Sequence, residues 1–247
     1  MSVFRGLLDI IYPPRCAVCG AFLIHEKSLK GNGARGFCSR CLSDFHKIRP
    51  PYCTICGKPF ISENQEDHLC EDCLRKHPYY EALRAPYVYE GAMLEAIHLF
   101  KYGGKRHLSK SLGALIAQFA AEWLGADNPL LVMPVPLHPK RLRERGFNQS
   151  LLLGRDVALR LGVKLDFLSL RRVRYTQPQT TLGRKERLKN VREAFALEPL
   201  SNVKGKRILI VDDVTTTGST LNECARILKR AAAEKVFALT LARAISH

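Results

Sequence analysis

ILIVDDVTTTGST, residues 208–220, combines a strand pattern, an acidic pair and a hydroxyl-rich turn. Its first four residues are aliphatic, which is typical of a strand buried on both faces of a parallel sheet. Asp212 and Asp213 follow, and the turn after them contains one glycine. The apolar spacing of residues 221–232 predicts a helix directly after the turn. Because the N-terminus of a helix presents free N–H groups and a partial positive charge, this turn is a predicted phosphate site.

The two carboxylates add a second function to the same segment. They can accept hydrogen bonds from a diol such as a ribose, or help to hold a magnesium ion. No lysine follows Gly218, so the turn is not a Walker loop, and it lacks the three glycines of the dinucleotide fingerprint. Each residue alone is common as a helix cap, but the complete order favours a phosphate and ribose site.

Composition places the chain among folded, basic proteins. It has 247 residues, 46% of them hydrophobic, which excludes a disordered chain and predicts one or two domains. The formal charge of +16 indicates a polyanionic partner, either nucleic acid or a phosphorylated small molecule. No apolar run approaches the ~20 residues that span a bilayer. Residues 3–12 predict a short amphipathic helix that either docks on the protein or anchors it, and they lack a signal-peptide pattern. We therefore expect a cytoplasmic protein without a transmembrane segment.

Eight of the nine cysteines form four C-x-x-C pairs within the first 73 residues. Without a signal peptide, such pairs indicate metal ligands rather than disulfides. CAVCG and CTICG begin two similar halves, so the sequence predicts two structural zinc ions. The predicted ligands are Cys16, Cys19, Cys38, Cys41, Cys53, Cys56, Cys70 and Cys73. The repeat favours sequential pairing of the halves, and a cross-braced pairing stays open. Four thiolates leave no position for water, which argues against catalysis at these sites.

The cysteine pairs end before His77-Pro78, where we place the boundary between a zinc module, residues 1–78, and a second domain, residues 79–247. Strand patterns at 84–90, 130–137, 167–171, 194–197, 206–211 and 235–242 alternate with helical patterns at 91–102, 108–124 and up to residue 161. This alternation predicts an α/β fold with a parallel sheet flanked by helices.

Ligands of such sheets bind beyond the carboxyl ends of the strands. That rule brings the loop after Pro136, residues 140–149, to the same edge as the phosphate turn. The basic residues 172–190 lack apolar periodicity and predict a mobile lid over a phosphorylated substrate. The cationic candidates for pyrophosphate or nucleic-acid contact are Arg141, Arg143, Arg145, Arg172 and Arg174. The alternative for the first three is a solvated helix face.

Several longer motifs accompany the C-x-x-C pairs. They are LFKYGGK (99–105), PVPLHPKRLRERGFNQS (134–150), TQPQTTLGRKERLKNV (176–191) and VDDVTTTGST (211–220). Over nearly its whole length the chain closely resembles the ComF family, including ComFC-like and GntX-type members. The resemblance implies a type I phosphoribosyltransferase fold behind a zinc module. It also implies a role in natural transformation, on the cytoplasmic side, during uptake of single-stranded DNA.

The resemblance further implies a binding site for phosphoribosyl pyrophosphate (PRPP) together with magnesium. Asp212 and Asp213 would bind the ribose hydroxyls. The 5′-phosphate would be held by Thr215, Thr216, Thr217, Gly218, Ser219 and Thr220. Purine-salvage enzymes of the hypoxanthine type have a proton-handling Asp where this chain has Thr216. The turn is thus nearer the orotate type, or it supports no transfer, and the sequence identifies no catalytic residue.

Three functions are compatible with these motifs. The first is a binding factor that handles single-stranded DNA, together with the DNA-uptake machinery. The second is a PRPP-dependent phosphoribosyltransferase acting on an unknown base or amine. The third is a PRPP-sensing regulator. The sequence specifies neither the acceptor nor the oligomeric state.

Overall fold

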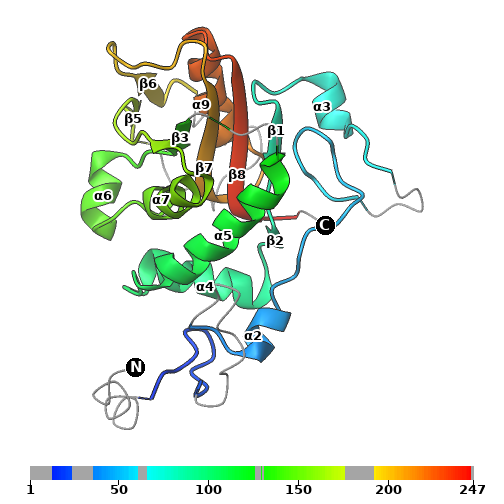
Figure 1. Cartoon of the computed structure of the whole chain (residues 1–247), viewed down its shortest axis with the longest axis vertical. Coiled ribbons are helices and arrows are strands. Elements are labelled where there is room, and N and C mark those ends of the chain that lie inside the picture. The colour runs from blue at the N-terminus through cyan, green and yellow to red at the C-terminus, as the bar shows by residue number, and fades with distance from the viewer. Residues whose placement is uncertain are drawn as a thin grey trace.

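The computed structural model describes residues 13–23, 36–60, 66–125, 129, 131–175 and 192–245. The helix expected over residues 3–12 lies outside the described residues, as does most of the predicted lid (176–191). The architecture is an α/β sheet with helices on both faces and two Cys-rich units at its periphery (Figure 1).

The main sheet is parallel, with the strand order β1-β8-β7-β3-β4. Its centre consists of β3 (Leu131–Pro134), β7 (Arg207–Thr215) and β8 (Lys235–Arg243). The flanking strands are β1 (Ala82–Arg84) and β4 (Lys164–Leu165). The strand predicted over 84–90 is two short strands, because β2 (Tyr87–Val88) pairs with β8 beyond Pro86, which has no N–H to donate. A separate antiparallel pair joins β5 (Leu170–Arg172) to β6 (Phe195–Leu197).

Alternate residues of the central strands enter two separate cores. Leu209 and Val211 pack with α4 (Gly91–Tyr102), α5 (Leu108–Leu124) and α7 (Gln149–Leu161). Ile208 and Ile210 pack on the opposite face with α9 (Ser219–Arg230). The near-continuous aliphatic run is therefore explained by burial on both faces.

Residues 140–149 were placed in the loop after Pro136, with a solvated helix face as the alternative for their arginines. The structure agrees with the alternative, because Pro139–Arg145 form α6. Pro139 occupies the first turn, where a missing N–H costs nothing, and Gly146 ends the helix at φ 75°. No residue of α6 is buried, so the apolar periodicity that reveals a packed helix is absent.

The two Cys-rich units sit at different places on the sheet. The first ribbon (residues 13–23 and 36–45) contains α2 (Ser39–Ser43) and shares the core of α4 and α5. The second ribbon (residues 52–60 and 66–75) contains α3 (Glu71–Arg75) and shares the core of α9. Figure 1 shows the first ribbon beyond α4 and the second beside β1.

Candidate functional site

Each ribbon brings four cysteine sulfurs together. Cys16, Cys19, Cys38 and Cys41 form one group, and Cys53, Cys56, Cys70 and Cys73 form the other, with all sulfurs of a group within 4.8 Å of one another. The Sγ atoms of Cys19 and Cys38 are 3.6 Å apart, and those of Cys56 and Cys70 are 3.7 Å apart. Four thiolates at about 2.3 Å from a tetrahedral zinc ion are separated by about 3.8 Å, so both groups fit zinc. The pairing is sequential, as the repeat favours.

Backbone N–H groups in the second ribbon prepare a thiolate for metal binding. The N–H groups of Cys56 and Cys70 each donate to Cys53 Sγ at 3.4 Å. Burial opposes ionisation of Cys53, but these hydrogen bonds outweigh it and lower its pKa to about 7. A thiolate is the form that binds zinc, so the hydrogen bonds at Cys53 favour the liganding state of that residue, whereas burial raises the pKa values of Cys56 and Cys73.

A cavity of about 240 Å³ opens at the carboxyl ends of β3 and β7. Its wall combines the acidic pair, most of the hydroxyl-rich turn and three arginines. The predicted site residues that line it are Asp212, Asp213, Thr215, Thr216, Gly218, Ser219, Thr220, Arg141, Arg145 and Arg172. The structure thus brings together segments that are separated by about 70 residues in the chain.

The acidic pair lies within β7 rather than after it, because β7 continues to Thr215. Lys101 Nζ on α4 lies 2.9 Å from Asp213 Oδ1, and Ser150 Oγ on α7 donates to Asp212 Oδ1 at 2.7 Å. Burial and the charge of Asp213 raise the pKa of Asp212 to about 6. Burial alone would lower the pKa of Lys101, but Asp213 outweighs it and raises that pKa. In this pair, Asp213 is therefore ion-paired with Lys101, and Asp212 has a pKa raised to about 6.

The hydroxyl-rich turn ends in a left-handed residue at the start of α9. Gly218 has φ 74° and precedes Ser219, the first residue of the helix. Thr217 does not line the cavity; its Oγ1 donates to Ser219 Oγ at 3.0 Å and accepts from the Ser219 N–H at 3.4 Å. The helix N-terminus faces the cavity through Ser219 and Thr220, which is the arrangement that binds anions.

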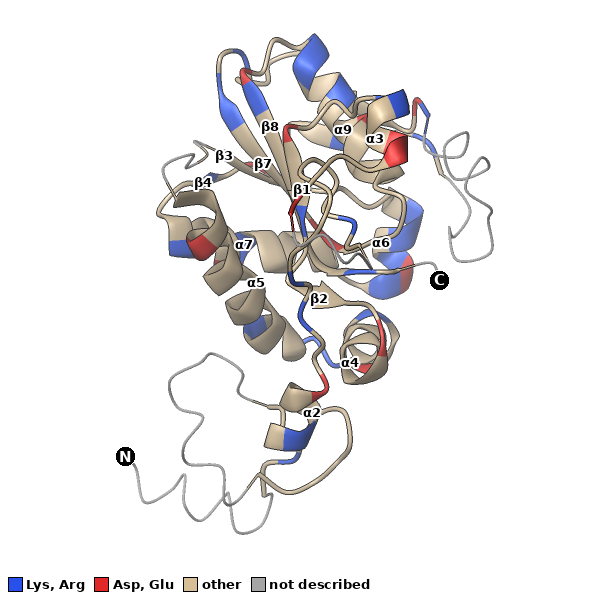
Figure 2. Cartoon of the chain, turned by 90° about the vertical axis from the view of Figure 1, so that its right-hand side faces the viewer, with Lys and Arg blue, Asp and Glu red and all other residues tan. Residues whose placement is uncertain are grey.

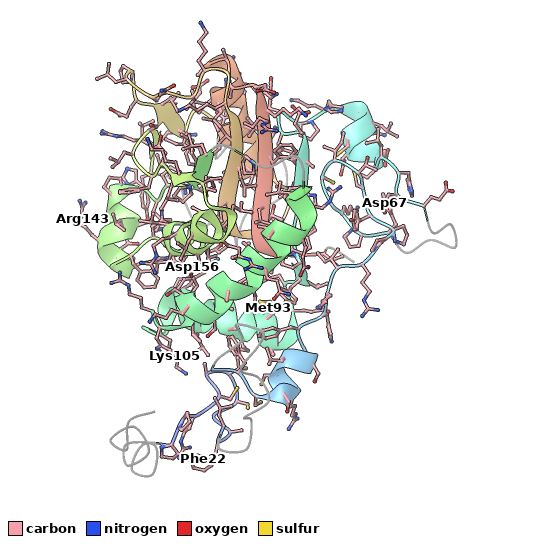
Figure 3. All side chains as sticks on the ribbon, in the orientation of Figure 1. Phe22, Asp67, Met93, Lys105, Arg143 and Asp156 are labelled. Carbon is pink, nitrogen blue, oxygen red and sulfur yellow. The ribbon has the colours of Figure 1, made fainter. Side chains whose placement is uncertain are left out.

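The motif RGFNQS builds the opposite wall. The Asn148 side chain caps α7 by accepting from the N–H groups of Ser150 and Leu151, and its Nδ2 donates to the Val135 carbonyl at 3.0 Å. This fixes α7 to the end of β3. On α6, Arg141 and Arg145 line the cavity, whereas Arg143 is exposed and points away from the sheet (Figure 3). Arg174 is also exposed outside the cavity, and its Nη2 donates to the Arg192 carbonyl at 2.6 Å.

Some buried donors at the cavity have no acceptor among the described residues, and two of them lie side by side. They are Gln149 Nε2 and Arg145 Nε. Gln149 is only 1% exposed, and its Oε1 accepts from Arg145 Nη1 at 3.2 Å. A buried polar group without a partner is costly, so the cavity is built to receive acceptor atoms from a ligand.

Comparison with known proteins agrees with both halves of this architecture. Residues 7–74 match a double zinc ribbon domain, and residues 148–247 match a phosphoribosyl transferase domain. The "DNA utilization protein YhgH" of Salmonella typhimurium is 34% identical over 213 residues, which cover 85% of this chain and 91% of that protein. The chain belongs to the ComF family. "Competence protein F" of Haemophilus influenzae is 30% identical over 85% of this chain and 91% of its own length. "Competence protein ComFC" of Streptococcus pneumoniae is 28% identical over 236 residues, which cover 93% of this chain and 100% of that protein.

These matches confirm the predicted family and the predicted fold class of a phosphoribosyltransferase-like parallel sheet behind zinc ribbons. Across the part of this ComF-family chain that the structure describes, no helix is long and apolar enough to cross a membrane.

Sequence reasoning missed three residues of the ComF-family site: Lys101, Gln149 and Ser150. Lys101 lies one turn beyond Ile97, which is fully buried, so a lysine on the apolar face of α4 was an available signal. Gln149 and Ser150 open α7, and their inward direction depends on the Asn148 cap. The sequence could predict the cap, because an Asn precedes a helical pattern. It could not predict the cavity that Gln149 and Ser150 line.

A second cavity of about 540 Å³ lies on the other side of α6 in this ComF-family structure. Leu137 and Arg172 line both cavities. Most of its wall is apolar, and Phe167 and Leu168 remain 52% and 64% exposed at its edge. Its described lining contains arginines and no acidic residue.

Proposed function

We propose that the cavity between β7, α6 and α7 binds PRPP, or a closely related phosphoribosyl ligand, together with magnesium. The observation that carries this proposal is the buried Gln149 Nε2, which lacks an acceptor beside a helix N-terminus and an acidic pair. A pyrophosphate supplies acceptor oxygens, and a ribose supplies the diol that suits carboxylates.

In the proposed complex, three groups of residues contact three parts of the ligand. Asp212 and Asp213 bind the ribose hydroxyls and help to hold magnesium. The residues of the turn, 215–220, hold the 5′-phosphate through backbone N–H groups and hydroxyls. Arg141, Arg145 and Arg172 contact the pyrophosphate. Since Arg143 and Arg174 lie outside the cavity, any contact they make is with a larger anion such as nucleic acid.

Calorimetric titration with PRPP and magnesium tests this function. The wild-type chain should bind in one saturable step, and the double variant Asp212→Asn, Asp213→Asn should lose that step. Glu122→Gln, which neutralises an exposed carboxylate on α5, is the matched control and should bind as the wild type does. Equal binding by the double variant and the control would contradict the proposal.

We further propose that the chain serves DNA uptake, handling single-stranded DNA on the cytoplasmic side beside the uptake machinery. The names of its relatives support a role in DNA utilization and competence. Figure 2 shows Lys and Arg segments along α6, whose one acidic residue, Glu144, lies 3.7 Å from Arg141. Exposed aromatic rings lie next to these cations: Tyr102 is 61% exposed with Arg145 4.9 Å from its ring centroid, and Tyr175 is 38% exposed with Lys140 at 4.8 Å.

Cations beside exposed rings are suited to phosphates and stacked bases. Binding of a single-stranded oligonucleotide should therefore weaken steeply as salt rises, by about one order of magnitude or more between 50 and 200 mM. Arg143→Ala should lower both the affinity and the salt slope. Repeating the PRPP titration with oligonucleotide present shows whether the two ligands compete. Absent or salt-insensitive DNA binding would contradict this role.

A second candidate function is phosphoribosyl transfer to a base or amine. It is favoured by the second cavity, because the shared wall at Leu137 and Arg172 places an apolar, basic site next to the proposed PRPP site. The test is release of pyrophosphate from PRPP in the presence of nucleobases and amines. The double variant Asp212→Asn, Asp213→Asn should abolish release, and no release with any acceptor counts against transfer.

A further inference from the structure

Arg243, the last residue of β8, connects the phosphate turn to the second ribbon. It is only 5% exposed. Its Nη1 donates to the Thr216 carbonyl at 3.2 Å, and its Nη2 donates to the carbonyl of Cys56. One planar guanidinium group therefore hydrogen-bonds a residue of the turn and a ligand of the predicted zinc site.

No carboxylate of the described residues balances the charge of Arg243. Among the described residues, its side chain forms no ion pair with an acidic group. A buried charge is costly unless an opposite charge lies nearby. A zinc ion held by four thiolates has a net charge of about −2, and Cys56 belongs to such a group. A zinc-loaded ribbon would thus supply the counter-charge for Arg243.

A second contact supports the turn from the same side. A Cβ atom on Gly218 would lie 3.0 Å from Tyr80 Oη and 3.3 Å from Leu83 Cδ2. Both residues belong to the segment that leaves the second ribbon, and Tyr80 is 3% exposed. The Leu83 N–H donates to the Ile55 carbonyl of the ribbon at 2.7 Å. The ribbon, this segment and the turn are therefore packed in sequence without space between them.

The described residues of the first ribbon, 13–23 and 36–45, make no comparable connection. Its Ala17 carbonyl accepts from Lys105 Nζ at 2.9 Å, and Asp44 Oδ2 accepts from the Ala92 N–H at 2.7 Å. These contacts attach it to the two ends of α4. In the ranges that the structure describes, no hydrogen bond joins the first ribbon to residues 214–220.

We propose that zinc in the second ribbon, acting through Arg243, holds the turn at residues 214–220 in its phosphate-binding conformation. Arg243 is a positioning residue, and zinc in the first ribbon has no such effect. The part of this inference that concerns affinity rests on the proposed phosphoribosyl site. Because structural zinc contributes folding free energy, loss of the ion releases the Cys56 carbonyl and with it the position of Arg243.

The test compares Cys73→Ser with Cys16→Ser, which each disrupt one ribbon, after the zinc content of both variants has been measured. Hydrogen exchange of the amides at 214–220 should accelerate about tenfold or more in Cys73→Ser and stay within about twofold in Cys16→Ser. Ribose 5-phosphate, titrated by calorimetry, should bind about tenfold more weakly to Cys73→Ser alone. Protection of β3 and of residues 207–213 of β7 should persist in both variants. Equal effects of the two substitutions, or none, overturn the inference.

Arg243 is tested directly while both zinc ions remain bound. Arg243→Met should accelerate exchange at 214–220, and Arg243→Lys should accelerate it less, because a lysine keeps the charge but not the two-pronged geometry. Unchanged exchange in Arg243→Met, with two zinc ions present, overturns the inference. Exchange needs no ligand, so this arm is decisive even if the wild-type chain binds neither PRPP nor ribose 5-phosphate, a result that would count against the proposed function alone.

Discussion

Lys101 Nζ on α4 lies 2.9 Å from Asp213 Oδ1 on β7, with the two side chains only 15% and 10% exposed. This contact joins the helix face of the sheet to the floor of the cavity. It neutralises one of two adjacent carboxylates, and the other, Asp212, is held by Ser150. The floor of the cavity thus does not carry two uncompensated negative charges.

Removing the ammonium group leaves a buried charge without its partner. We expect Lys101→Met to lower the free energy of unfolding by about 3 kcal/mol, measured by urea denaturation. Adding Asp213→Asn to this variant should recover most of the loss, because the unpaired charge is then absent. Arg75→Met breaks the Arg75–Glu71 ion pair, whose side chains are 77% and 76% exposed, and should cost less than about 1 kcal/mol. Similar losses in Lys101→Met and Arg75→Met would contradict the buried pairing.

Asp212 makes stability depend on pH in a defined direction. Its pKa is raised from an ordinary 3.8 to about 6 in the folded chain. Between these values the folded chain retains a proton that the unfolded chain has released, so this group's contribution to stability falls as pH rises. Asp212→Asn cannot ionise, and it should be more stable than the wild type at pH 7, by at most about 3 kcal/mol. The melting temperatures of the wild type and Asp212→Asn should converge as the pH is lowered towards 4.

Asp166 serves as a control of opposite sign. Burial opposes its ionisation, but hydrogen bonds from Ser169 and Leu168 outweigh burial and lower its pKa. This group stabilises the fold above its unfolded pKa, and that stabilisation is lost as pH falls through the folded value. Asp166→Asn should therefore destabilise the chain more at pH 7 than at pH 3. The same pH trend in both Asn variants would show that the trend does not come from these carboxyl groups.

Two arginines on α6 allow direct ligand contact to be distinguished from general electrostatic attraction of an anion. Arg145 lines the cavity, and Arg143 is exposed on the outer side of the same helix. We expect Arg145→Ala to weaken magnesium–PRPP binding at least about tenfold, since it removes charge-assisted hydrogen bonds. Arg143→Ala should change the affinity about twofold or less at 150 mM salt, where exposed charges are screened. Equal weakening by both, measured by calorimetry, would indicate a nonspecific effect of positive charge.

The internal repeat provides a matched pair of glycines. Gly20 and Gly57 occupy the same position after C-x-x-C, with φ 74° and 68°. A Cβ on Gly20 meets no atom within 4 Å, whereas one on Gly57 would lie 2.4 Å from the Leu83 carbonyl oxygen. We expect Gly20→Ala to cost about 1 kcal/mol from backbone strain alone.

Gly57→Ala should cost clearly more, about 3 kcal/mol or above, because backbone must also move. Denaturation curves and the zinc content of both variants provide the measurement. Equal costs for the two substitutions would show that the second ribbon does not pack tightly on β1.

The zinc ligands, the family and the parallel sheet could all be predicted from the sequence, because spacing and periodicity are local properties. The bounds of α4 and α5 agree with the apolar spacing at 91–102 and 108–124. α6 was foreseen only as the alternative to a loop, because its side chains line two cavities instead of packing in a core. Lys101 was missed because its partner, Asp213, is more than 100 residues away. The domain boundary at residue 78 and the roles of residues 212–220 stay predictions.

The N-terminal third also closes the open side of the sheet. Among the residues that the structure describes, no further strand lies outside β1 and β2, yet the outward N–H of Leu83 donates to the Ile55 carbonyl and that of Val88 to the His46 carbonyl. Residues 46–55 therefore occupy the positions that a strand from a neighbouring molecule would use. An unprotected edge of this kind is a site of intermolecular pairing and aggregation. The segment that joins the two ribbons, together with the start of the second ribbon, therefore covers the β1 and β2 edge of the sheet against such pairing.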